Sequence, residues 1–307
     1  MHGIAVIGEA VIDLAAGGDD EPWPAHPGGS PYNVAIGLAR LEQPTYFVGR
    51  LSRDPLGTLL RNRAVRSGVD LSLAVDAREP STVALVELDD AGSARYRFGV
   101  DGTADFVWTE AELARIPDDI AAVHFGSLAS WLPPGDARIA SRVAALRASG
   151  ALVSYDPNVR PQLQPDAAAA REQLERLIAL AHLVKTSEDD VAWLRPGEAV
   201  DDVAHGWLAL GPAAVVVTRG AGGATAFTAS GSITRIPPLV DIVDTVGAGD
   251  SFMSGLLDAL ARRDLLTPGA IAGAPFGDLL DDAGLVAAIT CSRAGASPPR
   301  RAELRGG

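Results

Sequence analysis

The chain has 307 residues, a formal net charge of −13 and a hydrophobic fraction of 47%. This length fits either one large α/β domain with an appendage or two domains. The acidic balance, with no basic run longer than a pair, argues against a nucleic-acid-binding protein. No apolar run reaches about 18 residues, so we expect no transmembrane helix and no membrane partner. The single cysteine and the absence of a signal-peptide pattern predict a cytoplasmic location.

Apolar runs of strand length alternate with segments of helical period. Strands are expected near residues 3–7, 45–49, 121–125, 151–155, 182–185, 214–218, 224–228 and 232–235. Helices are expected over 30–42, 55–67, 136–150, 166–181, 249–263 and 277–292, with a further start at the capping box of Thr109 and Glu112. This alternation predicts an α/β fold with a mostly parallel sheet covered on both faces. Ligands of such sheets gather at the carboxyl ends of the strands.

Two regions interrupt the alternation. Residues 82–88 and 94–98 flank Asp89-Asp90-Ala91-Gly92, which is a hairpin signal. Residues 8–27 are irregular and rich in Gly, Pro and Asp. Together these regions predict a small β lid over 9–27 and 81–105. The remaining residues, 1–8, 28–80 and 106–307, would form the core.

The most informative stretch is residues 244–257, which read Asp-Thr-Val-Gly-Ala-Gly-Asp-Ser-Phe-Met-Ser-Gly-Leu-Leu. A helix beginning there would direct unpaired N–H groups of residues 247–249 and a positive dipole at one point, which makes an anion site. A carboxylate at such a site, that of Asp250, makes sense if it accepts a proton from a hydroxyl that attacks a phosphate. The stretch therefore predicts phosphoryl transfer to an alcohol.

Polar residues follow other predicted strands, and each has a simpler reading. Asn33, in the stretch Gly28-Gly29-Ser30-Pro31-Tyr32-Asn33, can bind hydroxyls, although a plain loop with Ser30 as N-cap explains the same residues. Asp13 suits paired sugar hydroxyls, although a solvated loop residue is the simpler alternative. Arg160 follows Asp156-Pro157-Asn158-Val159 and could steady a phosphate. A turn built from Asp, Pro and Asn accounts for that loop but not for Arg160.

Nucleotide-binding signals are weaker. Lys185 is the single lysine among 26 basic residues, and it lacks the Gly-Lys-Ser/Thr context of a phosphate-binding loop. Nucleotide phosphates would then need backbone N–H groups, arginine and a metal ion. Residues 218–223 could cradle a nucleotide or simply close a hairpin. Residues 187–190 offer oxygen ligands for Mg²⁺, or a capping box formed by Ser187 and Asp190.

Taken together, these motifs resemble the ribokinase-like (PfkB) carbohydrate kinases over essentially the whole chain, and fructokinases most. The resemblance rests on residues 28–33 and 244–250, with fructokinase-like stretches at Val6–Glu9, Thr103–Asp105, His124–Ser127 and Tyr155–Arg160. It implies a three-layer α/β/α core with a β-sheet lid and a homodimer formed through the lid. It also implies that Asp250 is the base and that the amides of Gly247, Ala248 and Gly249 form the anion hole.

The resemblance assigns further roles by position. The sugar would contact Asp13, Gly28, Gly29, Asn33 and Asp250 beneath Phe98, and Arg160 would lie near the path of the phosphoryl group. The remaining implied contacts are Ser187, Thr218, Arg219, Gly220, Gly223 and Gly249 for ATP, Glu188 and Asp190 for Mg²⁺ through water, and Asp244, Val246, Arg293 and Gly295 for a monovalent cation such as K⁺. Two positions depart from the family pattern. Ser187 and Asp190 replace Asn and Glu of the Asn-x-x-Glu motif, and Ser297-Pro298-Pro299 ends the cation loop without one side-chain ligand.

The sequence therefore predicts an ATP- and Mg²⁺-dependent kinase that phosphorylates a primary hydroxyl of a monosaccharide, with fructose preferred. Alternative acceptors are 2-keto-3-deoxygluconate, which would need a lid cation such as Arg95 or Arg97, ribose, or a nucleoside, which would need an aromatic clamp. A sugar- or ATP-binding protein without catalysis is the alternative from another class. A dinucleotide oxidoreductase is excluded because Gly8 is not followed by the Gly-x-Gly-x-x-Gly spacing.

Overall fold

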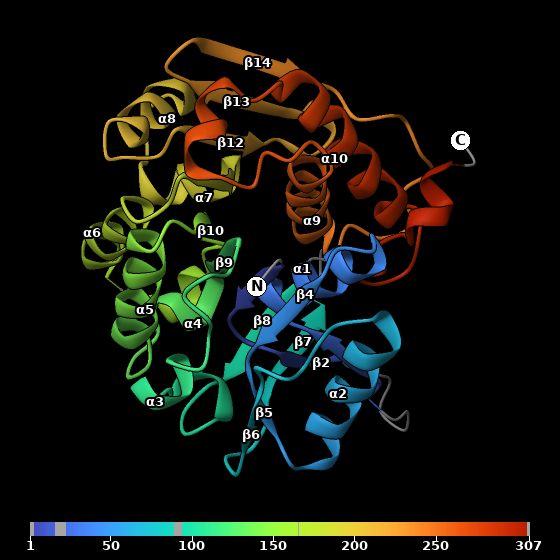
Figure 1. Ribbon diagram of the computed structural model, residues 1–307. Helices are drawn as coiled ribbons and strands as arrows, with labels where there is room; N and C mark the ends of the chain where they lie inside the picture. The colour runs from blue at the N-terminus through green and yellow to red at the C-terminus, as the bar shows by residue number, and fades with distance from the viewer. Residues whose placement is uncertain (1–2, 16–22, 89–93, 165, 306–307) are drawn as a thin grey trace.

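An eight-stranded sheet forms the centre of the molecule (Figure 1). The computed structural model describes residues 3–15, 23–88, 94–164 and 166–305. Across the sheet the strands are β14 (Gly231–Arg235), β13 (Ala224–Thr228), β12 (Ala214–Thr218), β11 (Leu183–Ser187), β10 (Leu152–Asp156), β9 (Ala122–Gly126), β1 (Ile4–Ile7) and β4 (Thr45–Val48). The strands from β12 to β4 are parallel, whereas β13 and β14 run antiparallel at one edge.

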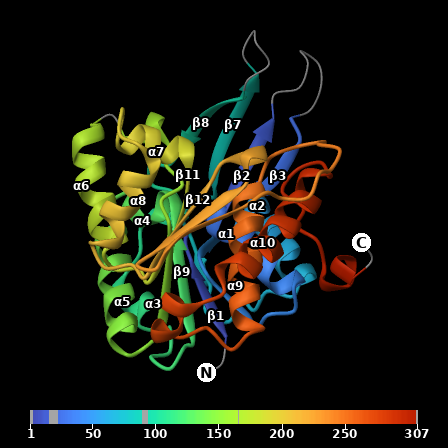
Figure 2. The same cartoon turned by 90° about the horizontal axis from the view of Figure 1, so that it is seen from above.

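Helices cover both faces of this sheet, as Figure 2 shows from above. One face packs against α1 (Ser30–Arg40), α2 (Pro55–Ser67), α9 (Ala248–Ala261) and α10 (Phe276–Cys291). The other packs against α3 (Glu110–Leu113), α4 (Ser127–Trp131), α5 (Asp136–Ala148), α6 (Ala167–Ile178), α7 (Glu188–Leu194) and α8 (Val200–Leu208). Short 3₁₀ turns lie at η1 (Ala104–Phe106), η2 (Pro161–Leu163), η3 (Gly220–Gly222), η4 (Pro268–Gly273) and η5 (Arg301–Arg305).

The two apolar cores explain why the central strands are apolar throughout. Val215 and Val217 point into the core beneath the helices α5 to α8, and Val216 points into the opposite core. All three are fully buried. Strands buried on both faces carry continuous apolar runs instead of alternating ones. The predicted three-layer α/β/α fold is therefore confirmed.

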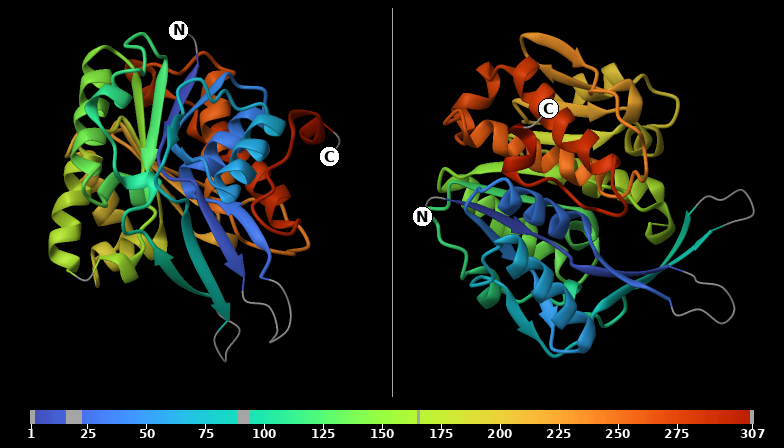
Figure 3. Two further views of the ribbon diagram at one scale, coloured as in Figure 1. Left: turned by 90° about the horizontal axis from the view of Figure 1, so that it is seen from below. Right: turned by 90° about the vertical axis from the view of Figure 1, so that its right-hand side faces the viewer.

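A second, four-stranded sheet extends away from the core (Figure 2, Figure 3). Its order is β3 (Ala25–Gly28), β2 (Val11–Ala15), β7 (Thr82–Leu88) and β8 (Ala94–Gly99). These strands fall inside the ranges expected for a lid, apart from Gly28 at the end of β3. Whether the sheet opens and closes over a ligand stays a prediction. A third pair, β5 (Arg50–Ser52) and β6 (Val75–Ala77), lies beside the core.

Several elements differ from the sequence prediction. Residues 9–27 were placed in the β lid without individual strands, and they form β2 and β3; Asp13 lies within β2 instead of in a loop. Each of these strands is short, and β3 contains Pro27, which is tolerated because β3 is an edge strand. The pairing of β2 with β7, 71 residues away along the chain at Val11 and Thr82, is invisible to local patterns. Strands β5 and β6 and helix α8 were not predicted either, and the predicted turn over 89–92 lies outside the described residues.

Two buried carboxylates connect the small sheet to the core. Asp105, in η1, accepts hydrogen bonds from the backbone N–H of Ala10 at 2.8 Å and from the hydroxyl of Thr82 at 2.5 Å. Glu9 accepts one from the N–H of Ala129 at 3.0 Å. Burial is the main cause that raises the pKa of Asp105 to about 7, and the nearby Glu9 adds to it. Burial also raises the pKa of Glu9.

We expect this burial to make the protein less stable as the pH rises from about 4 to about 7. In that window native Asp105 still binds a proton that the unfolded chain has released near its usual pKa of 3.8, so raising the pH favours the unfolded chain. The Asp105→Asn variant should lose this part of the pH dependence. The difference in the free energy of unfolding, measured with urea across the window, should be of the order of a few kcal/mol.

A matched control is Thr82→Val, which removes one hydrogen bond to Asp105 but no titrating group. Because the hydrogen bond from Thr82 lowers the pKa of Asp105, its loss raises that pKa further, and the free energy of unfolding should still fall as the pH rises, over a window at least as wide as in the wild type. Parallel curves for wild type and Asp105→Asn would show that Asp105 ionises at its usual pH in the folded protein.

Candidate active site

A cavity of about 670 Å³ lies at the carboxyl edge of the parallel strands, between the sheet, the small sheet and the N-terminus of α9. We call it the main cavity. Of the predicted site residues, those that line it are Asp13, Gly29, Asn33, Phe98, Arg160, Ser187, Asp190, Thr218, Val246, Gly247, Ala248, Gly249 and Asp250. Those that do not line it are Gly28, Glu188, Arg219, Gly220, Gly223, Asp244, Arg293 and Gly295. The convergence follows from parallel pairing, which places successive strand ends at one edge.

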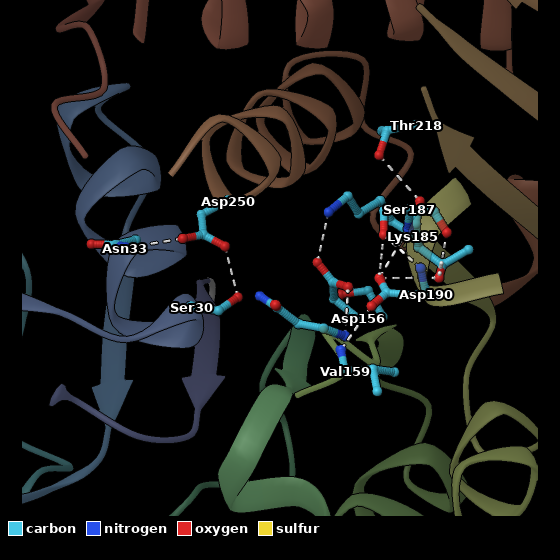
Figure 4. A network of polar contacts seen from close by, with 12 residues as sticks. Ser30, Asn33, Asp156, Val159, Lys185, Ser187, Asp190, Thr218 and Asp250 are labelled. Carbon is cyan, nitrogen blue, oxygen red and sulfur yellow. Dashed lines mark hydrogen bonds and ion pairs between the residues drawn. The ribbon is translucent and has the colours of Figure 1, made fainter. Parts of the chain in front are cut away.

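Asp250 is the third residue of α9 and lies 8% exposed at the inner end of the main cavity. One carboxylate oxygen accepts a hydrogen bond from Ser30 Oγ at 2.7 Å, and the other accepts one from Asn33 Nδ2 at 2.9 Å (Figure 4). Burial raises the pKa of Asp250, while the hydrogen bonds from Asn33 and Ser30 and the charge of Lys185 act in the opposite direction. The carboxylate is therefore fixed in orientation and held as a stronger base than an exposed aspartate.

Ser30 differs from the prediction made for it. It was expected to cap α1, but Gly29 is the N-cap residue, and Ser30 is the first residue of the helix. Its hydroxyl donates to Asp250 from a distance of 220 residues along the chain. Local sequence patterns favour capping by serine, and they carry no information on a partner so remote.

Gly247 is the N-cap residue of α9 and adopts a left-handed conformation with φ of 75°. A Cβ atom at this position would lie 2.5 Å from Cβ of Ala296, so glycine is needed for both conformation and space. The N–H of Ala248 donates to the carbonyl oxygen of Thr245 at 3.2 Å. Gly247, Ala248 and Gly249 line the main cavity, and amides in the first turn of a helix have no acceptor four residues earlier within the helix.

Several other groups that line the main cavity are suited to binding hydroxyls. Asn33 Oδ1 is buried and has no hydrogen-bond partner within the described part of the chain. Burial raises the pKa of Asp13 to about 6; the positive charge of Arg160 lowers this pKa, and the negative charge of Asp250 raises it. Arg160 Nη1 donates to the carbonyl oxygen of Val159 at 2.9 Å, which holds the guanidinium at the rim. Phe98 contributes an aromatic side chain from β8.

A smaller cavity of about 260 Å³ adjoins the main cavity, and we call it the side cavity. The two share Thr218, Thr245, Ala248 and Gly249. The side cavity is lined mostly by apolar groups, including Phe252 and Leu280, and also by the predicted residues Gly220 and Gly223. Arg219 instead donates to Thr225 Oγ1 at 2.5 Å and lies 3.5 Å from Asp201.

The predicted capping box at the start of α7 is present. Ser187 Oγ accepts from the N–H of Asp190 at 3.0 Å, and one carboxylate oxygen of Asp190 accepts from Ser187 N at 3.1 Å. The other carboxylate oxygen accepts from the N–H of Val159 at 2.8 Å. Asp190 is therefore largely engaged by the protein itself, and its predicted role toward Mg²⁺ stays a prediction, as does that of Glu188. Asp189, which lies within the stretch of possible oxygen ligands but was given no specific role, lines the main cavity.

The loop predicted to bind a monovalent cation lies behind the start of α9. Asp244 accepts from the N–H of Val246 at 3.0 Å and from the N–H of Gly295 at 2.8 Å, so it joins the two predicted segments. Arg293 forms an ion pair with Glu303 at 2.6 Å. No cluster of three or more metal-binding His, Cys, Asp or Glu side chains occurs in the ranges that the structure describes.

Three acidic or basic residues of the site were not selected from the sequence. Glu9 and Lys185 line the main cavity, and Asp156 forms a buried ion pair with Lys185 at 2.9 Å. Lys185 was set aside because it lacks the context of a phosphate-binding loop. The signal that could have found it is its place near the end of a predicted strand, where ligands of a parallel sheet collect.

Comparison with known proteins decides the class. The model of the pfkB family of carbohydrate kinases matches residues 1–303. The chain belongs to this family. It is 35% identical over 272 residues to a fructokinase of Rhizobium leguminosarum bv. trifolii, covering 88% of this chain and 83% of the relative. Family membership confirms the prediction of an ATP-dependent carbohydrate kinase.

Solved structures of family members agree with this fold. A fructokinase of Xylella fastidiosa with bound ATP superposes with a TM-score of 0.90 at 26% identity, covering 98% of this chain and 96% of that one. A fructokinase of Vibrio cholerae O395, bound to fructose, ADP and calcium ion, superposes with a TM-score of 0.84 at 27% identity, covering 98% and 97%. None of the described helices combines the length and apolar character needed to cross a membrane.

Proposed function

We propose that this chain transfers the γ-phosphoryl group of ATP to a primary hydroxyl of fructose. The observation that supports this most is the position of Asp250, a buried carboxylate at the inner end of the main cavity and in the first turn of α9. A carboxylate there repels an anionic ligand. A role in the reaction explains why the chain places one at this position. As general base it accepts the proton of the attacking hydroxyl while the amides beside it bind the phosphoryl oxygens.

The anion hole is proposed to consist of the amides of residues 247–249. The Ala248 amide already donates to Thr245 in a long bond of 3.2 Å. We therefore expect Gly247 and Gly249 to provide the stronger donors, with Ala248 joining them when its bond to Thr245 gives way. Arg160 at the cavity rim would offset further charge on the phosphoryl group.

ATP is proposed to extend from the side cavity into the main cavity. The side cavity offers apolar walls for the base, and its shared residues, Thr218, Ala248 and Gly249, lie at the passage toward Asp250. The fructokinase of Xylella fastidiosa, which has the same fold and bound ATP, supports the choice of ATP as the nucleotide. Predicted contacts of Gly220 and Gly223 with the nucleotide agree with their place in the side cavity.

The acceptor is proposed to bind beneath the small sheet. Asp13, the unpartnered Asn33 Oδ1 and the backbone near Gly29 offer hydrogen-bond partners for several hydroxyls, and Phe98 offers an apolar cover. Fructose is the preferred acceptor because the curated relatives named here are fructokinases. Among the described side chains that line the main cavity, Phe98 is the one aromatic group, which does not make a clamp for a nucleoside base. Trp108, an aromatic residue that follows the small sheet in sequence, is buried in the core.

We also propose two metal sites, which the resemblance to the family implies. The carboxylates of Asp189 and Asp190 face the phosphate path, and Asp189 retains more acceptor capacity because Asp190 is engaged by Ser187 and Val159. Bound Mg²⁺ would neutralise charge on the phosphates. A monovalent cation such as K⁺ would lie at Asp244, whose carboxylate accepts two bonds and keeps further lone pairs. A homodimer formed through the small sheet and a cytoplasmic location remain proposals from the sequence.

The proposed function is tested by a coupled assay of ADP release with a panel of acceptors, with and without Mg²⁺ and K⁺. Fructose should give the highest kcat/KM, and omission of Mg²⁺ should abolish turnover. Preference for ribose, 2-keto-3-deoxygluconate or a nucleoside would reassign the acceptor. Binding of fructose measured by calorimetry, without ADP release from any acceptor, would instead indicate a binding protein without catalysis.

A further inference from the structure

The only lysine of the chain is buried inside the active site. Lys185 lies on β11, its side chain is 5% exposed, and its Nζ lies 2.9 Å from a carboxylate oxygen of Asp156, which is 1% exposed. Taking an ammonium and a carboxylate out of water is costly, and apolar residues often replace such a pair without loss of stability. The other 25 basic residues are arginines. A compact ammonium at this one buried position therefore calls for a role beyond the ion pair.

The ammonium adjoins the proposed anion hole. A Cβ atom built on Gly249 would lie 2.9 Å from Lys185 Nζ, so the two are in close contact and glycine leaves the space that the lysine approaches. Both residues line the main cavity together with Asp250. Figure 4 shows Lys185 and Asp250 on opposite sides of one space, with Asp156 below the lysine.

Lys185 also has hydrogen-bonding capacity to spare. An ammonium carries three donors. The acceptor that contacts Nζ among the described residues is Asp156. Asp156, Asp190 and Asp250 all favour its charged form, and together they raise the pKa of Lys185 against the effect of burial. The group is therefore a permanent cation, held in place by Asp156, with donors that remain for a ligand in the main cavity.

The local charge balance requires such a cation. The chain carries a net charge of −13, and the main cavity is lined by Glu9, Asp13, Asp189, Asp190 and Asp250. Against these acids stand Arg160 at the rim and Lys185 beside the start of α9. Arg160 is held through carbonyl oxygens of its own loop, whereas Lys185 is fixed by a buried carboxylate next to Gly249. Lys185 is thus a fixed cation in contact with the proposed anion hole.

We propose that Lys185 is a catalytic residue whose ammonium contacts the phosphoryl group during transfer, and that Asp156 is a positioning residue for it. This proposal rests on the proposed function. The sugar oxygen forms a bond to the γ-phosphorus while the bond from that phosphorus to the β–γ bridging oxygen breaks. The hydroxyl proton passes to Asp250, and ADP leaves with the bonding electron pair. Lys185 keeps its proton throughout and offsets the charge on the transferring oxygens.

Steady-state kinetics of Lys185→Met test this role. The side chain stays unbranched, is one heavy atom shorter and loses its charge, so kcat should fall by about 10²–10³-fold, as for the loss of one electrostatic contact in a transition state. The KM values for ATP and sugar should change by a few-fold. A fall in affinity for ATP with kcat unchanged would assign Lys185 to ground-state binding and overturn the proposal.

A double variant separates catalysis from structure. Lys185→Met alone leaves Asp156 as an unpaired buried charge, which destabilises the fold. Lys185→Met with Asp156→Asn removes both charges and should restore the melting temperature while kcat stays low. Recovery of wild-type kcat in the double variant would show that the pair is structural.

A measurement on the unaltered protein completes the test and does not depend on the folding of a variant. Because the chain has one lysine, protein labelled with ¹⁵N-lysine gives a single side-chain ammonium signal. Addition of ADP, fructose and aluminium fluoride, a mimic of the transferring phosphoryl group, should shift that signal beyond its position with ADP and fructose alone. An unchanged signal in a complex that demonstrably forms would overturn the proposal.

The two proposals fail in different ways. If the wild-type protein phosphorylates no acceptor, the proposed function is wrong and the role of Lys185 falls with it. If the wild type is active and Lys185→Met keeps kcat within a few-fold of it, the role of Lys185 alone is wrong.

Discussion

Replacement of Asp250 by Asn is expected to lower kcat by about 10²–10⁴-fold, the usual contribution of a general base. The KM for the sugar should stay within a few-fold of its wild-type value. The substitution keeps the shape of the side chain. Its amide oxygen can accept from Ser30, and its NH₂ group can donate to Asn33 Oδ1 if the Asn33 amide turns over. The loss therefore reports on proton transfer and not on packing. Coupled ADP release under saturating ATP measures it.

Asp258→Asn is a matched control for that experiment. Asp258 lies on the same helix, α9, and is also buried, but it pairs with Arg262 and Arg301 and does not line the main cavity. This variant should lose stability, because it weakens a buried ion-pair cluster, and should keep kcat within a few-fold. Near-normal turnover in Asp250→Asn, with Asp258→Asn behaving as expected, would leave the enzyme without its proposed base.

The large sheet could be predicted from the sequence because its strands carry a local signal. Strands such as β12, with Val215, Val216 and Val217, are buried on both faces and form apolar runs too short for helices. The small sheet is different. Its strand β2 has five residues, and it is stabilised by pairing with β7 far along the chain. Only the tertiary partner distinguishes such a strand from a loop.

The candidate site shows the same division. The stretch around Asp250 could be predicted because a helix start, two glycines and an acid follow one another directly. The ion pair between Asp156 and Lys185 could not, because it joins the ends of two strands 29 residues apart. Lys185 was not selected as a site residue because its neighbours in sequence do not form a phosphate-binding loop. The proposed role of Lys185 depends instead on its contact with Gly249, which lies beside it only after folding.

The role of Ser30 illustrates a further limit. Serine before proline at a helix start has a strong preference for capping. In the folded protein the neighbouring Gly29 is the cap residue, and the hydroxyl of Ser30 binds Asp250 instead. The local preference for capping and the long-range hydrogen bond to Asp250 compete for the hydroxyl of Ser30. The hydrogen bond to Asp250 is the contact that belongs to the candidate active site.

Replacement of Gly247 by Ala is expected to lower kcat by about 10²–10³-fold, comparable to the loss of one oxyanion-type donor. A left-handed conformation costs a non-glycine residue roughly 1–2 kcal/mol. In addition, the new Cβ would lie 2.5 Å from Cβ of Ala296, so the N-terminal turn of α9 must shift. That shift moves the amides of residues 247–249 relative to Asp250. Coupled ADP release and thermal unfolding on the same samples measure both effects.

Two further variants separate strain from displacement. Gly150 has φ of 99°, and a Cβ there meets no atom within 4 Å. Gly150→Ala should therefore destabilise the protein by the backbone strain alone, roughly 1–2 kcal/mol, and leave kcat unchanged. Gly247→Ala combined with Ala296→Gly removes the clash but keeps the backbone strain, and it should recover part of the lost kcat. If the double variant is no more active than Gly247→Ala, contact with Ala296 does not set the position of these amides. If Gly247→Ala itself turns over normally, the amides at the start of α9 do not need this geometry for phosphoryl transfer.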